Sequence, residues 1–202
     1  MDTLPLYKEL VAYLQNARIP DAAFDVRCMF EQVTGKTLEM LMTEGLSTED
    51  ENPLRNMAQR RAFGEPLQYI LGEWEFYGMR MFVGQGVLIP RPDTETLVDS
   101  VLSYGKGKQG LRIADLCTGS GCIALALQKH LPDAQVTAIE LSAEALSFAR
   151  KNAQEHGLPV TLIQADVLLP ETAEAHRELD VIVSNPPYLT AQEMCELQRE
   201  IT

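Results

Sequence analysis

Leu111-Arg-Ile-Ala-Asp-Leu-Cys-Thr-Gly-Ser-Gly-Cys122 is the stretch that decides the fold. Its first six residues form a mainly apolar run of the length of a buried β-strand. Gly119 and Gly121 then predict a tight turn, because glycine adopts backbone conformations that other residues disfavour. Residues 122–130 follow with the apolar pattern of a helix. The order strand, glycine-rich turn, helix predicts the start of a parallel sheet.

The same alternation continues to the end of the chain. The near-continuous apolar character of the strands is typical of a parallel sheet that helices cover on both faces. Right-handed crossovers then give an α/β, Rossmann-like doubly wound sheet. The predicted elements are strand 135–140, helix 142–156 capped by Ser142 and closed by Gly157, strand 160–165, helix 171–178 and strand 179–184.

Upstream of the sheet the pattern changes twice. Residues 1–72 predict a small all-α domain of about four helices, and residues 73–83 predict a β-hairpin of two short strands. Pro90 and Pro92 stiffen a loop around Arg91, after which Asp93 or Thr94 caps a helix. We expect a helical domain over 1–72, a hairpin and linker over 73–93, and the sheet domain over 94–202.

Composition restricts the class of protein. The chain has 202 residues, 46% of them apolar, and a net charge of −12, which disfavours a nucleic-acid partner because phosphate backbones are bound through Lys and Arg. No apolar run reaches the length of a membrane helix, and no leader peptide is recognisable. The four cysteines form no CxxC pair, so we expect reduced thiols, no metal site and a cytoplasmic location.

Acidic residues mark the ends of three successive predicted strands. Asp115 precedes the glycine-rich turn, Glu140 ends the next strand and Asp166 ends the third. Glu140 can accept from ribose hydroxyls, while Asp166 and the backbone N–H of Val167 suit an adenine ring. Each feature alone also fits an ordinary turn, a solvated acid or a helix cap. Together they favour a site for a nucleoside with a charged amino-acid tail.

Asn185-Pro-Pro-Tyr188 follows the last predicted strand. The two prolines make a rigid, extended loop that presents acceptors, namely the Asn185 side-chain oxygen and the Pro186 carbonyl. An NH₂ group that donates to both would have its nitrogen held toward a methyl donor, and Tyr188 offers a flat face for stacking. The alternative interpretation of Asn-Pro-Pro-Tyr is a surface turn without a ligand. The position at a strand end beside the glycine-rich loop favours a site.

These motifs together resemble the peptide chain release factor glutamine methyltransferases, the HemK/PrmC family. Residues 64–78 (Gly-Glu-Pro-Leu-Gln-Tyr-Ile-Leu-Gly-Glu-Trp-Glu-Phe-Tyr-Gly) and 88–95 (Leu-Ile-Pro-Arg-Pro-Asp-Thr-Glu) carry the likeness, together with the glycine-rich loop and Asn-Pro-Pro-Tyr. The resemblance covers essentially the whole chain. It implies S-adenosyl-L-methionine as cofactor and methylation of the glutamine in the Gly-Gly-Gln motif of class-one release factors. The helical domain is implied to bind the release factor, and a monomer is expected.

The resemblance also implies roles for individual residues. Asn185, Pro186 and Tyr188 are expected to act in catalysis, with Pro187 and Arg91 also near the substrate. The expected cofactor contacts are Asp115, Cys117, Thr118, Gly119, Ser120, Gly121, Glu140, Asp166, Val167 and Asn185.

Two departures from the family pattern follow. Cys117 replaces a glycine of the general methyltransferase motif, so we expect no positive φ there. The family's sheet continues beyond the fourth strand, so we expect the sheet of this chain to be C-terminally incomplete.

Two other functions fit part of the pattern. A DNA or RNA amino-group methyltransferase would use the same Asn-Pro-Pro-Tyr residues, although the acidic charge and residues 64–78 and 88–95 argue against it. A catalytically incomplete fragment that binds cofactor or partner is the other alternative. Methyl transfer to a release factor, to nucleic acid or to neither separates the three.

Overall fold

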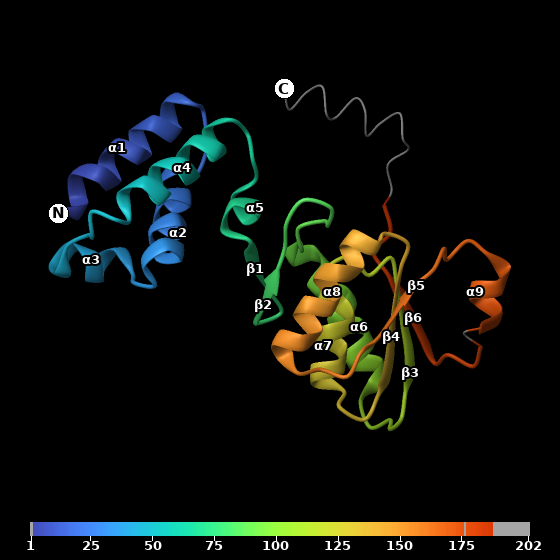
Figure 1. Ribbon diagram of the computed structural model, residues 1–202. Coiled ribbons are helices and arrows are strands. Elements are labelled where there is room, and N and C mark those ends of the chain that lie inside the picture. The colour runs from blue at the N-terminus through green and yellow to red at the C-terminus, as the bar shows by residue number, and fades with distance from the viewer. Residues whose placement is uncertain (1, 176, 188–202) are drawn as a thin grey trace. The chain divides into compact units, whose positions relative to one another are not determined.

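The computed structural model describes residues 2–175 and 177–187. Within this part the chain divides after Gly72 into two compact units, each with its own buried core (Figure 1). The first unit is helical and the second carries both β-sheets. None of the helices described combines the length and the apolar character that crossing a membrane requires.

Within residues 2–72 the helical unit contains five helices rather than about four. Buried Leu6, Leu10 and Leu14 line one face of the first helix at the spacing the sequence predicts. The fifth helix was missed because five residues are too few to show a helical period. The helices are α1 (Thr3–Asn16), α2 (Ala22–Thr34), α3 (Leu38–Glu44), α4 (Glu51–Ala62) and α5 (Leu67–Leu71).

A β-hairpin opens the second unit. Strands β1 (Glu73–Phe76) and β2 (Met79–Phe82) pair antiparallel around the two-residue loop Tyr77-Gly78. Both loop residues have positive φ, 52° and 66°, which is the pattern of a type I′ turn and matches the twist of the strands. The Tyr77 backbone N–H donates to Glu95 Oε1 at 2.8 Å, so the hairpin is fixed to the helix that follows it.

In the part of the chain that the structure describes, the main sheet has four parallel strands in the order β5-β4-β3-β6. The Rossmann-like α/β fold predicted from the sequence is confirmed. In chain order the elements of this unit after the hairpin are the 3₁₀ turn η1 (Pro92–Thr94), α6 (Glu95–Gly105), β3 (Arg112–Leu116), α7 (Cys122–His130), β4 (Gln135–Glu140), α8 (Ala143–His156), β5 (Thr161–Gln164), α9 (Pro170–Ala175) and β6 (Val181–Ser184).

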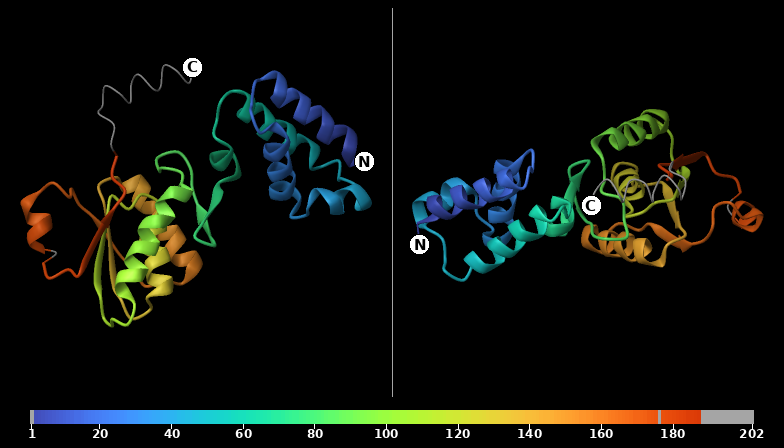
Figure 2. Two further views of the ribbon diagram at one scale, coloured as in Figure 1. Left: turned by 180° about the vertical axis from the view of Figure 1, so that it is seen from behind. Right: turned by 90° about the horizontal axis from the view of Figure 1, so that it is seen from above.

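The two faces of the main sheet differ in how much helix covers them. Figures 1 and 2 show α6, α7 and α8 packed on one face, with α9 beyond the other. The central helix α7 is buried from Cys122 to Gln128 because the sheet and the neighbouring helices enclose it. Among the described residues the second face is more open, and Ile182 of β6 remains 63% exposed.

Candidate functional site

The strand order places a switch point at β3. From β3 the chain moves to β4 and β5 on one side, then returns to place β6 on the other side of β3. Leu116 and Ser184 are paired, so the loops that follow β3 and β6 leave the sheet side by side at its carboxyl edge. Open α/β sheets bind ligands at such a point.

The loop between β3 and α7 is held close to the sheet. Its Thr118 backbone N–H donates to the Ile139 carbonyl at 3.1 Å. Gly121 has φ +83°, and an added Cβ would lie 3.1 Å from the Ala149 Cβ, so glycine suits both the left-handed backbone and the close approach to α8. Gly119 also has positive φ, but an added Cβ would meet no atom within 4 Å. The loop is therefore packed at Gly121 and open at Gly119, which leaves room for a ligand against its backbone.

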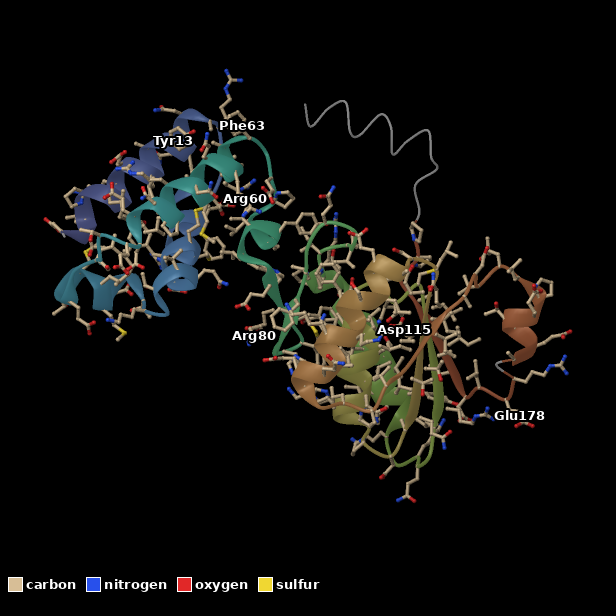
Figure 3. All side chains as sticks on the ribbon, in the orientation of Figure 1. Tyr13, Arg60, Phe63, Arg80, Asp115 and Glu178 are labelled. Carbon is tan, nitrogen blue, oxygen red and sulfur yellow. The ribbon has the colours of Figure 1, made fainter. Side chains whose placement is uncertain are left out.

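Asp115 lies beneath this loop and is completely buried in the sheet unit (Figure 3). Its Oδ2 accepts from the Thr118 hydroxyl at 2.5 Å and from the Ala124 backbone N–H at 3.2 Å, while Oδ1 is buried without a hydrogen-bond partner. Burial raises the pKa of the Asp115 carboxyl to about 7. The side chain thus ties the two ends of the loop together from inside the protein.

This burial predicts a pH dependence of stability. Because the folded pKa lies above the ordinary value of 3.8, the folded state retains a proton between about pH 4 and pH 7 that the unfolded state has lost. Asp115 should therefore lower the free energy of unfolding as pH rises through this window, by about 1 kcal/mol per unit. Urea denaturation at about pH 5 and about pH 7 should show this decrease in the free energy of unfolding for the parent and a smaller decrease for Asp115→Asn. Asp133→Asn, which removes an exposed carboxylate, is the control. Equal pH dependence of stability in the parent and in Asp115→Asn would contradict the prediction.

Glu140 ends β4 and is half-buried at the edge of the same loop. Its Oε2 accepts from the Gly119 backbone N–H and its Oε1 from the Ser142 backbone N–H, each at 3.0 Å. A carboxylate offers about four lone-pair sites, so these two bonds fix its orientation and leave capacity for further donors. Glu140 is therefore a positioned acceptor beside the open side of Gly119.

Cys117 corrects one sequence-based expectation. Its φ is +59°, so the position does adopt the left-handed conformation that the non-glycine residue led us to exclude. The conformation costs about 1 to 2 kcal/mol for an L-residue and is held here by the loop around it. Burial raises the pKa of the Cys117 thiol, which keeps it neutral. The path of the loop therefore requires a positive φ at position 117, whichever residue type stands there.

Asp166 and Val167 follow β5 and are half-buried. The Asp166 side chain accepts from the Leu168 backbone N–H at 2.9 Å, and its carbonyl accepts from the Thr172 hydroxyl at 2.7 Å. These bonds give the turn a defined shape at the carboxyl edge of the sheet. Within 2–175 and 177–187, His, Cys, Asp and Glu side chains form no group of three arranged to hold a metal ion.

The segment after β6 is anchored through its side chains. The Ser184 hydroxyl donates to the Leu116 carbonyl at 2.7 Å, across to β3. The Asn185 side-chain NH₂ donates to the Thr94 hydroxyl at 3.2 Å. Pro186 and Pro187 continue the chain, whereas Tyr188 lies outside the described residues. Arg91 is exposed in the loop that leads to Thr94, with extended backbone angles of −104° and 144°.

Asn152 of α8 was not recognised from the sequence. Its Oδ1 accepts from the Phe82 backbone N–H at 2.6 Å, and its Nδ2 donates to the carbonyls of Phe82 and Ser120 at 3.1 and 2.9 Å. One buried amide thus joins the hairpin, α8 and the glycine-rich loop. The available signal was a polar residue three positions after Ala149 on the buried face of the helix.

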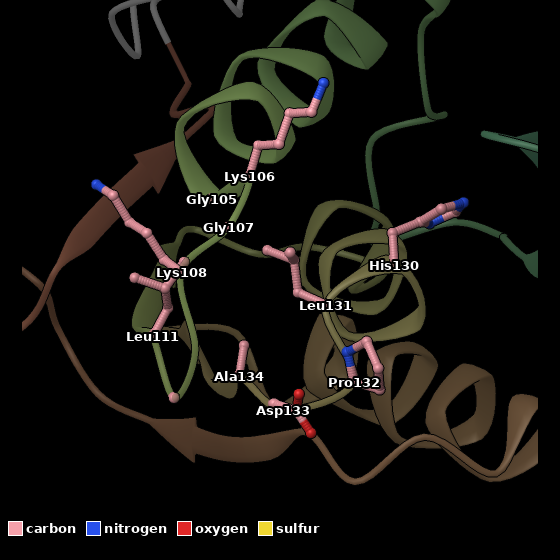
Figure 4. Close-up of a pocket in the computed structure, with 11 residues that line it drawn as sticks. Gly105, Lys106, Gly107, Lys108, Leu111, His130, Leu131, Pro132, Asp133 and Ala134 are labelled. Atoms are coloured by element: carbon pink, nitrogen blue, oxygen red, sulfur yellow. The ribbon is translucent and has the colours of Figure 1, made fainter.

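A cavity of about 230 Å³ lies elsewhere, between the start of β3 and the end of α7. Figure 4 shows that the charged ends of Lys106 and Lys108 and the ring of His130 point in different directions, away from one another. The cavity is at the amino-terminal edge of the sheet, opposite the loops described above. Nothing in its lining converges on a ligand, so the carboxyl edge is the candidate site.

Known families match both units. The family model described as "Methyltransferase small domain" matches residues 93–201, and the "PrmC N-terminal domain" matches residues 6–72. The first of these covers more than half of the chain.

Curated relatives match across both units. The release factor glutamine methyltransferase of Chlorobaculum tepidum is 36% identical over 208 residues, with 97% of this chain and 70% of that protein covered. Its counterpart in Geobacter sulfurreducens is 42% identical over 192 residues, covering 94% and 66%. That of Flavobacterium psychrophilum is 42% identical over 140 residues, covering 68% and 48%. The chain spans about half to 70% of the length of these relatives. It belongs to the release factor glutamine methyltransferase family.

Proposed function

We propose that this protein transfers a methyl group from S-adenosyl-L-methionine to the side-chain amide nitrogen of a glutamine. The observation that carries the proposal is the pairing of Leu116 with Ser184, which sets the glycine-rich loop beside Asn185-Pro186-Pro187 at the switch point. A cofactor on the first loop and an amide on the second would then be neighbours. The fold supplies their proximity, which is the main requirement for a reaction between two bound groups.

The residues present fit S-adenosyl-L-methionine. Gly119 leaves the loop backbone open, and Glu140 is held so that it can accept from the two ribose hydroxyls. Asp166 and Val167, in the turn that follows β5, would meet the adenine ring. Thr118, Ser120 and Cys117 contribute loop backbone, while Asp115 supports the loop from below without reaching the surface. When bound, the cofactor supplies an electrophilic methyl group on its sulfonium.

The acceptor is an amide whose lone pair is delocalised, so its orientation matters more than a strong base. Asn185 and the Pro186 carbonyl would accept from the substrate NH₂ group and turn its nitrogen toward the methyl donor. Pro187 keeps the loop extended. Tyr188 would stack on the amide plane, and Arg91 lies in the loop joined to Asn185 through Thr94. As the new N–C bond formed, the bond between the methyl group and the sulfur would break and leave a neutral thioether, and the amide proton would pass to water.

The substrate we propose is the glutamine of the Gly-Gly-Gln motif in class-one release factors. Two findings support this: the curated relatives are named release factor glutamine methyltransferases, and residues 6–72 match the PrmC N-terminal domain. That helical unit would bind the release factor, and residues 94–202 would form the catalytic domain. We propose that the enzyme acts in the cytoplasm, where such a substrate would be found, and that it acts as a monomer.

The test is transfer of labelled methyl from S-adenosyl-L-methionine to four acceptors: a release factor, the same factor with its Gly-Gly-Gln glutamine changed to alanine, DNA and RNA. We expect label on the intact release factor alone. Label on nucleic acid would instead support an amino-group methyltransferase of the same fold. Cofactor binding in calorimetry without label on any acceptor would support the binding-only alternative.

A further inference from the structure

The Thr94 hydroxyl has an unusual partner for its position. Thr94 precedes α6, but its backbone is already helical (φ −69°, ψ −21°), so its side chain does not cap the helix as an extended N-cap residue does, by accepting from a backbone N–H of the first turn. Ser142 does this at the start of α8 by accepting from the Ala145 N–H at 3.2 Å. Thr94 makes no such cap bond, although it is only 8% exposed. Its hydroxyl is therefore directed to something other than the helix.

That partner is the side chain of Asn185, 91 residues further along the chain. The Asn185 Nδ2 donates to the Thr94 Oγ1 at 3.2 Å. The Thr94 backbone is itself fixed, since its N–H donates to the Arg91 carbonyl at 3.0 Å in a turn that begins at Pro92. The bond thus connects a rigid proline-containing loop with the end of β6.

The remaining freedom of Asn185 lies in its side chain. Its backbone is restricted by the following Pro186 and by the Ser184 hydroxyl, which holds the strand end to Leu116. Two side-chain torsions then decide where the amide points. Because the amide is planar, a bond that holds Nδ2 toward Thr94 directs Oδ1 along the other branch, away from that hydroxyl.

We propose that Thr94 is a positioning residue for methyl transfer, whose hydroxyl holds the Asn185 amide so that its oxygen meets the substrate NH₂ group. This role rests on the proposed function of Asn185. It also gives a physical purpose to Thr94 within the segment 88–95.

The test compares Thr94→Val, which keeps the shape and removes the hydroxyl, with Thr94→Ser, which keeps the hydroxyl. Thr96→Val is the matched control, because it removes an exposed hydroxyl, which donates to the Asp93 carbonyl, at the same helix start. We expect Thr94→Val to lower kcat about 10- to 100-fold while the KM for both substrates changes less than about threefold. Thr94→Ser and Thr96→Val should stay within about threefold of the parent in kcat.

A second measurement does not depend on turnover. In ¹⁵N-labelled protein the side-chain NH₂ signals of Asn185 should shift in Thr94→Val and stay in place in Thr96→Val. Parent kcat in Thr94→Val, or unmoved Asn185 signals, would overturn the proposal. A parent enzyme that methylates nothing would count against the proposed function itself, and the NMR comparison would still decide whether Thr94 holds Asn185.

Discussion

Replacing Asn185 by alanine should lower the rate constant of methyl transfer at least about 100-fold. The substitution removes the acceptor that orients the substrate amide, and a delocalised lone pair aimed a fraction of an ångström away from the methyl group reacts poorly. The glycine-rich loop is shaped by bonds from Thr118 and Ala124 to Asp115 and from Gly119 to Glu140, so in Asn185→Ala the cofactor affinity should change less than about fivefold. The expected result is therefore a fall in kcat without a matching fall in the affinity for the cofactor.

Single-turnover measurements with saturating cofactor and release factor would show this most directly. Gln135→Ala is a suitable control, because it removes an exposed side-chain amide at the opposite, amino-terminal end of the same sheet. The control should retain the parent rate constant. If Asn185→Ala transferred methyl as fast as the parent, the assigned role of Asn185 would be wrong.

Glu140→Ala should weaken cofactor binding on the order of 100-fold, which corresponds to about 2.7 kcal/mol. Two losses contribute. The variant lacks the acceptor for the ribose hydroxyls, and it also leaves the backbone N–H groups of Gly119 and Ser142 without the carboxylate that now orders them. Titration calorimetry with S-adenosylhomocysteine measures the affinity directly, and Asp133→Ala controls for the loss of one exposed negative charge at the far end of the sheet.

A thermodynamic cycle separates the two contributions. An S-adenosylhomocysteine analogue without the ribose hydroxyls should bind the parent weakly, and it should lose less further affinity in Glu140→Ala than the natural ligand does. Strictly additive losses would mean that Glu140 shapes the loop without touching the ribose. Parent affinity for the natural ligand in the variant would remove Glu140 from the site altogether.

Sequence periodicity located most elements of the sheet unit within a residue or two. Helix 122–130 and strand 135–140 agree with α7 and β4, and Ser142 and Gly157 bound α8 as predicted, because caps and apolar spacing are local properties. Short elements were harder. The five-residue α5 was missed, and α9 ends at Ala175, three residues before the predicted helix end, since one or two turns carry too little pattern.

Conformation at the glycine-rich loop shows the limit of reasoning from residue type. Cysteine at position 117 argued against a positive φ, yet the loop imposes +59° there. The hydrogen bonds from Thr118 and Ala124 to Asp115 fix the two ends of the loop around it. Tertiary contacts overrode a local preference worth only about 1 to 2 kcal/mol.

The α/β class, the order of the strands along the chain and the motifs expected to carry the chemistry could all be predicted from the sequence, because each is encoded in a short window of residues. Only the tertiary structure showed that Asp115 is buried under its loop, that Glu140 is held by Gly119 and Ser142, and that Asn185 is bonded to Thr94. Those partners lie up to 91 residues apart. Hydrogen bonds between distant segments depend on the packing of the sheet and its helices, and no local pattern records them.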